Sequence, residues 1–130
     1  CDSVPSCGNR RPFCKLSIMN SGIDFQALYD TGASCTILNR AAFRKLPLAI
    51  QRKLIPSDDT TPAVETATGQ VVVPDGEIKL TFKFPNVKQA FTFPFKVLNG
   101  VSNDIFIGYD MTTALDLQLM PRQHVLLLGG

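Results

Sequence analysis

The sequence lacks any apolar run long enough to cross a membrane. Its longest uninterrupted apolar stretches are Val71–Val73 and Val125–Leu128, whereas a spanning helix needs about 20 apolar residues. The first residues, Cys1–Pro5, contain neither a basic nor an apolar segment, so we expect no signal peptide and no membrane partner. A chain that starts with cysteine instead of methionine is expected to be a fragment of a longer protein.

Cysteine and histidine are few and poorly spaced for a metal site. Five residues separate Cys1 from Cys7 and six separate Cys7 from Cys14, Cys35 stands alone, and the single histidine is the distant His124. Zinc sites use closely spaced cysteine pairs, and a disulfide scaffold spreads its pairs along the chain. We therefore expect no metal and no cofactor, and reduced thiols in a cytoplasmic protein. A metal or nucleic-acid module built on the first three cysteines is an alternative, which metal in the purified protein would support.

Charge is low and nearly balanced. Thirteen Lys and Arg residues face eleven Asp and Glu residues, which gives a net charge of +2. This balance offers no electrostatic reason to expect a nucleic-acid partner. With 45% hydrophobic and 18% charged residues, the chain is not disordered, and its 130 residues match one domain. We expect a flexible leader at residues 1–12, which has turn formers and no periodicity, and a folded domain at residues 13–130.

Short strands separated by turns dominate the folded part. Alternation of apolar and polar residues predicts a hairpin of strands 13–19 and 23–29 across an Asn-Ser-Gly turn, and an antiparallel pair 78–84 and 91–97. Shorter strands are expected at 35–38, 63–67, 71–73, 104–108, 117–119 and 125–128. Asn39 is expected to cap a helix at 40–46 that Pro47 ends, residues 47–62 to be mostly loop, and residues 109–115 to form a second short helix. This pattern indicates a mainly β barrel or sandwich.

The strongest local motif is Asp30-Thr31-Gly32, which follows an apolar strand. Alone, this triplet is typical of a strand-end turn in which the aspartate caps its own backbone. Here it is followed by Ala33-Ser34 and the apolar run 35–38, so the loop lies between two strands. A second apolar run, Ile105–Ile107, ends in Gly108 some seventy residues later and precedes the second helix.

This ordered series resembles the retroviral aspartic proteases, or retropepsins, and their relatives in LTR retrotransposons and cells. The resemblance covers residues 13–128: the hairpin, the Asp-Thr-Gly-Ala-Ser loop, a strand and helix, a flap-like segment 67–70, the run Gly76–Ile78, the run Ile107–Asp110 and a terminal strand. The chain is longer than the lentiviral enzymes, with Ser34 after Ala33 and Asp110 after Tyr109, so it is more similar to the retrotransposon or cellular branch. Residues 1–12 have no counterpart.

The resemblance implies a retropepsin-like closed β-barrel or sandwich with a flap hairpin and one or two short helices, which is one half of a homodimeric acid-protease fold. Catalysis in this family needs two carboxylates that share one proton, and this chain has one Asp-Thr-Gly. The implied function is therefore an aspartic endopeptidase that acts as a homodimer on peptides. The expected substrate is a retroelement polyprotein, processed in the cytoplasm or inside virus-like particles. The alternative is a catalytically silent module of the same fold for dimerisation or peptide binding, although the intact triplet counts against it.

The resemblance also implies roles for individual residues. Asp30 is the catalytic carboxylate, Thr31 holds the opposite loop across the dimer, and Gly32 lets the substrate backbone pass. The implied substrate-binding residues are Leu28, Ala33, Ser34, Ile37, Ala67, Thr68, Gly69, Gln70 and Phe106. Without the family, the segment 67–70 is interpreted as an ordinary hairpin, and Leu28, Ile37 and Phe106 as plain core. Asp110 is expected to be a structural hydrogen-bonding group, and the strand 125–128 to be buried at the dimer interface or, alternatively, in its own barrel.

Overall fold

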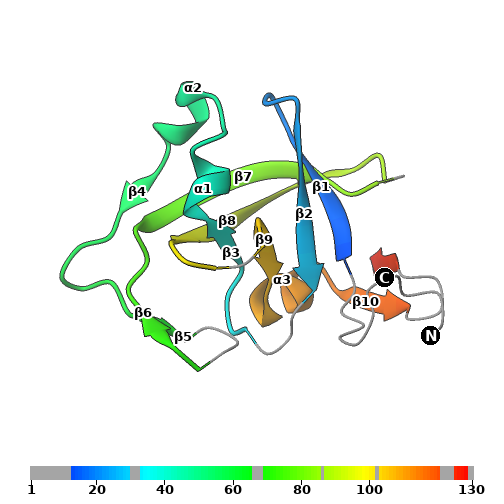
Figure 1. Cartoon of the computed structure of the whole chain (residues 1–130). Helices are drawn as coiled ribbons and strands as arrows, with labels where there is room; N and C mark the ends of the chain where they lie inside the picture. The colour runs from blue at the N-terminus through cyan, green and yellow to red at the C-terminus, as the bar shows by residue number, and fades with distance from the viewer. Residues whose placement is uncertain are drawn as a thin grey trace.

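Six strands close into a β-barrel in the computed structural model (Figure 1), which describes residues 13–29, 33–65, 69–85, 87–101, 103–120 and 125–128. Around the ring these strands are β1 (Phe13–Ile18), β2 (Ile23–Tyr29), β9 (Ile105–Ile107), β3 (Ile37–Asn39), β8 (Ala90–Leu98) and β7 (Gly76–Lys83). Pairing between β1 and β7 closes the ring, and the short β4 (Ile55–Pro56) pairs with β7 at the edge. The predicted mainly β, closed-barrel fold is confirmed.

The predicted hairpin of β1 and β2 is present. Phe13 lies opposite Leu28 at one end of the antiparallel pair, and Ile18 lies opposite Ile23 at the turn. Gly22 has a φ of 69°, a conformation that glycine adopts without steric cost. The hydroxyl of Ser21 donates to the carbonyl of Ile18 and accepts from the N–H of Ile23, so the turn is closed by its own side chain.

The longest ladder, between β7 and β8, supplies the centre of the core. The predicted alternating residues of this region are all buried: Ile78, Leu80, Phe82 and Phe84. Phe82 meets Phe84 and Phe95 edge to face, with ring centroids 5.7 Å apart in both pairs. Edge-to-face contacts are the favourable geometry for aromatic rings, so the strand alternation and the aromatic packing stabilise the same arrangement.

Strand β9 lies inside the sheet and determines what meets at one end of the barrel. It runs parallel to β2, with Phe106 beside Leu28, and antiparallel to β3, with Phe106 beside Ile37. All three of its residues are buried, as is usual for a strand covered on both faces. Because β2 and β9 are parallel, Tyr29 and Ile107 end their strands at the same end of the barrel. Strand β3 starts at that end.

Three short helices accompany the barrel in the described residues: α1 (Arg40–Phe43), α2 (Leu48–Gln51) and α3 (Tyr109–Ala114). The side chain of Asn39 accepts from the N–H of Ala41, which confirms the predicted cap. The helix predicted for 40–46 ends earlier, at Phe43. Residues 47–62 are mostly loop, as predicted, but α2 and β4 within them were not predicted.

Pro47 explains why the helix α2 was not predicted. A proline cannot continue a preceding helix, and it therefore indicated a stop. Its carbonyl nevertheless accepts from the N–H groups of Ile50 and Gln51, so the same residue begins the next helix. Proline suits a helix start because no N–H is needed there. Gln51 then donates from its side chain to the carbonyls of Arg44 and Leu46, which joins α2 to the end of α1.

Two small sheets stand apart from the barrel sheet. Strands β5 (Val64–Glu65) and β6 (Val71–Val72) pair antiparallel, as do β10 (Leu117–Met120) and β11 (Val125–Leu128). The C-terminal strand therefore pairs with β10, and its burial at a dimer interface stays a prediction. The expected leader at 1–12 lies outside the described residues. Among the described residues, no helix is long and apolar enough to span a membrane.

Candidate active site

The predicted catalytic residues Asp30, Thr31 and Gly32 lie outside the described residues. The structure instead describes the two segments that flank them. Tyr29 ends β2, and Ala33 begins the segment that leads into β3.

Ala33 is held against the start of α3. Its carbonyl accepts from the N–H of Tyr109 at 2.9 Å, and its side chain is buried. Gly108, the residue before this helix, lies directly on the backbone of Cys35, so that a Cβ at position 108 would overlap the Cys35 carbonyl. A glycine is required here by close approach of two backbones. Ala33, where the chain leaves the predicted catalytic loop, is therefore held by residues that follow β9.

A buried hydroxyl reinforces this junction. Thr36 is fully buried, and its Oγ1 donates to Asp110 Oδ1 at 2.8 Å and accepts from the N–H of Gly108 at 3.1 Å. Asp110 Oδ1 also accepts from the N–H of Met111 at 2.6 Å. The structural role expected for Asp110 at a helix start is therefore seen. Sequence reasoning missed Thr36, although a lone hydroxyl in the apolar run 35–38 was the available signal, since a buried polar group needs partners.

The three residues expected to line substrate pockets come together in one small apolar cluster. Leu28, Ile37 and Phe106 are buried there with Val64 of β5 and Leu98 of β8, apart from the main core. Partly buried side chains packed against the cluster are Phe13, Cys35, Val72 and Val101. In this chain all three predicted pocket residues are covered, and the β5–β6 hairpin supplies part of the cover through Val64 and Val72.

The predicted flap coincides with the turn of this hairpin. Val64 pairs with Val72 and Glu65 with Val71. Ala67 and Thr68 lie outside the described residues, whereas Gly69 and Gln70 are exposed. Gly69 has a φ of 85°, where any side chain would be strained. A hairpin is therefore present at the expected position, and sequence reasoning missed the contribution of its strands to the apolar cluster.

Comparisons with known proteins agree with this arrangement. A family model described as aspartyl protease matches residues 15–111. The chain belongs to the aspartyl protease family. Among solved structures it is similar to the retroviral protease-like domain of Ddi1 from Leishmania major, with a TM-score of 0.66 and 16% identity, over 91% of this chain and 86% of that chain. At that identity the likeness shows the retropepsin-like fold.

Two other comparisons add little. A protein of unknown function from Legionella pneumophila, Lpg0085, matches with a TM-score of 0.48 and 14% identity, over 80% of this chain and 85% of that one. A search of curated proteins gives no significant match. Family membership therefore rests on the family model.

The two described thiols of this aspartyl protease family member, Cys14 and Cys35, lie in environments that disfavour the thiolate form. Burial raises the pKa of Cys14 to about 12. Burial, and then the nearby Asp110 carboxylate, raise the pKa of Cys35 to about 11. Both cysteines are free, and the described residues contain no group of three or more His, Cys, Asp or Glu side chains that could hold a metal. Cys1 and Cys7 lie outside the described residues.

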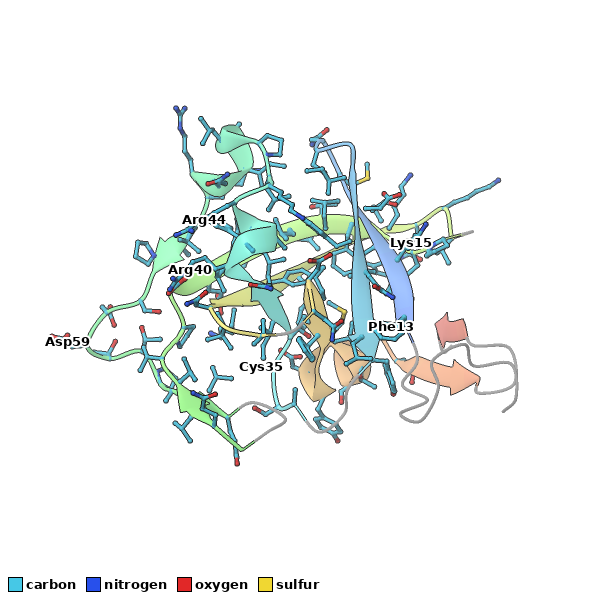
Figure 2. All side chains as sticks on the ribbon, viewed as in Figure 1. Phe13, Lys15, Cys35, Arg40, Arg44 and Asp59 are labelled. Atoms are coloured by element: carbon cyan, nitrogen blue, oxygen red, sulfur yellow. The ribbon has the colours of Figure 1, made fainter. Side chains whose placement is uncertain are left out.

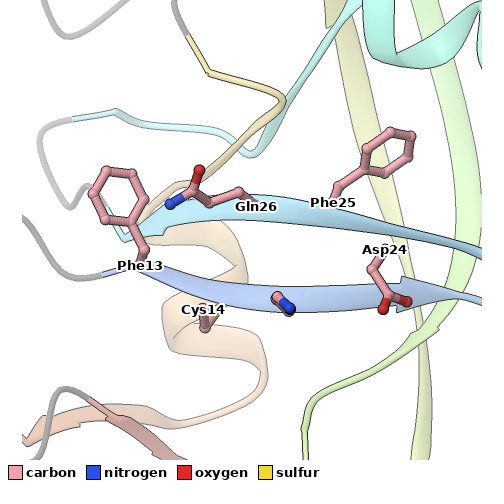
Figure 3. Close-up of a pocket in the computed structure, with 6 residues that line it drawn as sticks. Phe13, Cys14, Asp24, Phe25 and Gln26 are labelled. Atoms are coloured by element: carbon pink, nitrogen blue, oxygen red, sulfur yellow. The ribbon is translucent and has the colours of Figure 1, made fainter.

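A hollow on the β1–β2 hairpin (Figure 3) shares one lining residue, Phe13, with the edge of the apolar cluster. Its volume is about 490 Å³. The residues that line it are Phe13, Cys14, Lys15, Asp24, Phe25 and Gln26. None of the predicted site residues is among them, and Cys14 is protonated at neutral pH because its pKa is raised. The hollow therefore contributes nothing to the chemistry expected of the family.

Proposed function

We propose that this chain is an aspartic endopeptidase that acts as a homodimer, with Asp30 of each copy forming the catalytic pair. The observation that carries the proposal is the position of the Asp-Thr-Gly triplet in an aspartyl protease family member. It stands between Tyr29, the end of β2, and Ala33, which the N–H of Tyr109 holds against α3. A loop anchored at both flanks suits a catalytic group that must be held rigidly.

The mechanism follows from the chemistry of two adjacent carboxylates. Two such groups a few ångströms apart cannot both ionise easily, so they share one proton. The ionised carboxylate takes a proton from water, which attacks the peptide carbonyl, while the protonated one donates to that carbonyl oxygen. One chain supplies one Asp30, so a second copy related by a two-fold axis supplies the other.

Exposed groups beside the anchored loop support such an interface. Tyr109 is 61% exposed although its own N–H holds Ala33, and Ser34 is exposed as well. Tyrosine is enriched in protein interfaces. A second copy seated on this face would cover Tyr109 and bring the two Asp30 loops together.

The substrate is proposed to be a peptide with apolar side chains beside the cleaved bond. The apolar cluster formed by Leu28, Ile37 and Phe106 lies beside β5–β6, and movement of that hairpin as a flap would open it to a peptide and close it again. Ser34, Gly69 and Gln70 would then meet the peptide backbone. A retroelement polyprotein processed in the cytoplasm or in virus-like particles is the proposed natural substrate.

The decisive experiment is Asp30→Asn, assayed on a peptide with apolar residues on both sides of the cleaved bond, at mildly acidic pH. Replacing the carboxylate by an amide removes the shared proton but keeps the shape, so activity should fall by about 10²- to 10⁴-fold. A pepstatin-type inhibitor should block the wild type. Asp59→Asn is the matched control, because Asp59 is an exposed loop carboxylate that lies far from Cys35 in Figure 2.

Two outcomes would contradict the proposal. Equal cleavage by the wild type and Asp30→Asn would show that Asp30 is not the catalytic group. A wild type that dimerises and binds peptide without cleaving it would instead support the silent module of the same fold.

A further inference from the structure

We propose that the ion pair between Arg40 and Asp75 is a positioning device that fixes the base of the β5–β6 hairpin relative to the strand leaving the Asp30 loop. This inference rests on the proposed function for its catalytic consequence, but its structural part can be tested without peptide cleavage. Arg40 opens α1, directly after β3. Asp75 lies between β6 and β7, where the hairpin returns to the barrel.

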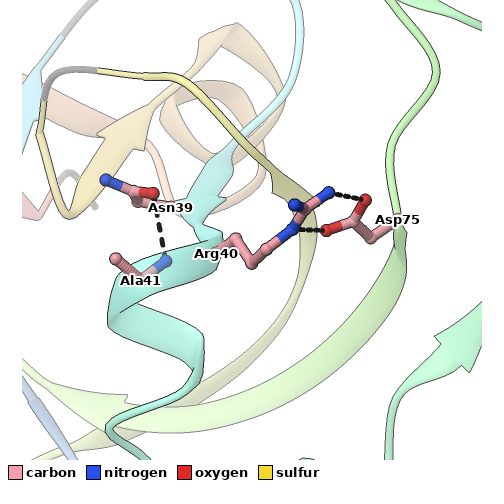
Figure 4. A network of polar contacts seen from close by, with 4 residues as sticks. All are labelled: Asn39, Arg40, Ala41 and Asp75. Carbon is pink, nitrogen blue, oxygen red and sulfur yellow. Dashed lines mark hydrogen bonds and ion pairs between the residues drawn. The ribbon is translucent and has the colours of Figure 1, made fainter.

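The contact between the two side chains is bidentate (Figure 4). Arg40 Nε donates to Asp75 Oδ2 at 2.5 Å, and Arg40 Nη2 donates to Asp75 Oδ1 at 2.6 Å. The planar guanidinium matches a carboxylate in this geometry, which fixes orientation as well as distance. The two side chains are 33% and 32% exposed, so the pair is partly shielded from water.

Asp75 is also held through its backbone. Its N–H donates to the carbonyl of Val97 on β8 at 2.7 Å, and its carbonyl accepts from the N–H of Ser57 at 3.0 Å. The next residue, Gly76, lies so close to the Ile55 carbonyl that a Cβ there would be 2.5 Å from the oxygen. The C-terminal base of the hairpin is therefore a fixed point on the barrel.

Arg40 is fixed from the other side by the residue before it. The N–H of Asn39 donates to the carbonyl of Asp104 at 2.8 Å, and its side-chain amide donates to the carbonyl of Val101 at 3.1 Å. Its side-chain oxygen caps α1 (Figure 4). Only two residues of β3, Ile37 and Leu38, separate Asn39 from buried Thr36. Short hydrogen-bonded segments therefore link Ala33, where the chain leaves the predicted catalytic loop, to the Asp75 carboxylate at the base of the hairpin.

This geometry predicts a specific role. The β5–β6 ladder is only two residues long on each strand, and such a short hairpin is marginally stable by itself. The position of the β5–β6 hairpin over the apolar cluster therefore depends on the residues that attach the hairpin to the barrel. Loss of the ion pair should let the hairpin move relative to β3, which raises KM and lowers kcat/KM without removing a catalytic group.

The chain offers a matched control in a second ion pair. Lys96 Nζ contacts Glu77 Oε1 at 2.6 Å, with side chains 30% and 34% exposed. The two residues are already opposite each other in the β7–β8 ladder, so this pair adds no connection between separate segments. Similar distance and exposure mean a similar electrostatic contribution, which is small for partly exposed pairs.

The test is a charge swap, measured by hydrogen exchange of the amides in 64–65 and 69–72 and by peptide cleavage. Arg40→Asp, Asp75→Arg and the conservative Asp75→Asn should each raise hairpin exchange and KM by about two- to fivefold. Arg40→Asp combined with Asp75→Arg should return both to within about twofold of the wild type. Lys96→Glu and Glu77→Lys should leave hairpin exchange unchanged.

Three results would overturn the proposal: unchanged exchange in Asp75→Asn, equal effects in the control pair, or no recovery in the double swap. Asp75→Asn keeps the backbone bonds and side-chain shape, so it covers the case in which a reversed charge prevents folding. Hydrogen exchange does not depend on cleavage. Loss of the proposed protease activity and failure of this inference are therefore distinguishable.

Discussion

Thr36 shows how much one buried hydroxyl can determine. It is fully buried and joins the segment after the predicted catalytic loop to Gly108 and Asp110. Thr36→Val keeps the shape but leaves the Gly108 N–H and the Asp110 carboxylate without this partner. We expect a loss of about 1–3 kcal/mol in the free energy of unfolding, measured by urea denaturation.

Thr81→Val is the control for this prediction. Thr81 makes an exposed hydroxyl contact with Thr92 across β7 and β8, where water replaces a lost partner. The free energy of unfolding of the Thr81→Val variant should differ from that of the wild type by less than about 0.5 kcal/mol. Equal losses in the two variants would argue against a special role for the buried junction.

The two described thiols give a second prediction at this scale. With pKa values of about 12 for Cys14 and about 11 for Cys35, alkylation at pH 8 should be at least about tenfold slower in the native protein than in urea. Peptide mass spectrometry measures each site separately. Because these pKa values are raised in the native state, their contribution to stability is present below pH 9 and falls as the pH rises toward 12. Equal alkylation rates in both states would contradict the burial.

At the scale of elements, the sequence predicted correctly those strands and turns that depend on residues close together in the chain. Alternation and turn residues were enough for the β1–β2 hairpin and for the pairing of β7 with β8. The helix α2 was missed because Pro47 gives the same signal for the end of one helix and the start of another. The ion pair of Arg40 with Asp75 and the bond from Thr36 to Asp110 join residues distant in sequence, and no periodicity reports such partners.

In the candidate site, too, some residues were predicted from the sequence and others were missed. The family motif indicated Leu28, Ile37 and Phe106, and the structure places them in one cluster. Val64 and Thr36 were missed, since their roles depend on which strands become neighbours. The sheet order that inserts β9 between β2 and β3 cannot be read from any single segment.

The β10–β11 pair carries a prediction about assembly. Leu117 pairs with Leu128, and Met120 pairs with Val125. Deleting residues 125–130 leaves β10 without its backbone partner, and an unpaired strand edge is costly unless another chain covers it. If β11 belongs to the proposed dimer interface, the truncated protein should dimerise less tightly and lose activity in proportion, as measured by sedimentation and peptide cleavage. A truncated protein that stays dimeric and fully active at low concentration would assign dimerisation to the surface around Tyr109.

At the scale of the whole molecule, one Asp-Thr-Gly per chain makes the activity of the proposed homodimeric protease depend on protein concentration. Specific activity should fall on dilution below the dimer dissociation constant, because each dissociation event separates the two halves of the proposed site. Sedimentation under the same conditions measures the dimer fraction directly. The two curves should coincide, and constant specific activity through a measured dimer-to-monomer transition would exclude the half-site model.

Closure of the barrel by distant strands also determines how the molecule must fold. Ala27 pairs with Ile105, and Ser17 pairs with Lys83. These partners are far apart in the sequence, so a long loop must close before either pair can form. High contact order of this kind slows folding to about milliseconds to seconds, in contrast to microseconds for local helical folds. The residues that hold Ala33 follow β9, so we expect them to be placed only once β9 has paired with β2. Stopped-flow refolding should therefore show hairpin formation first and the native environment of Tyr29 and Tyr109 only in the slow phase.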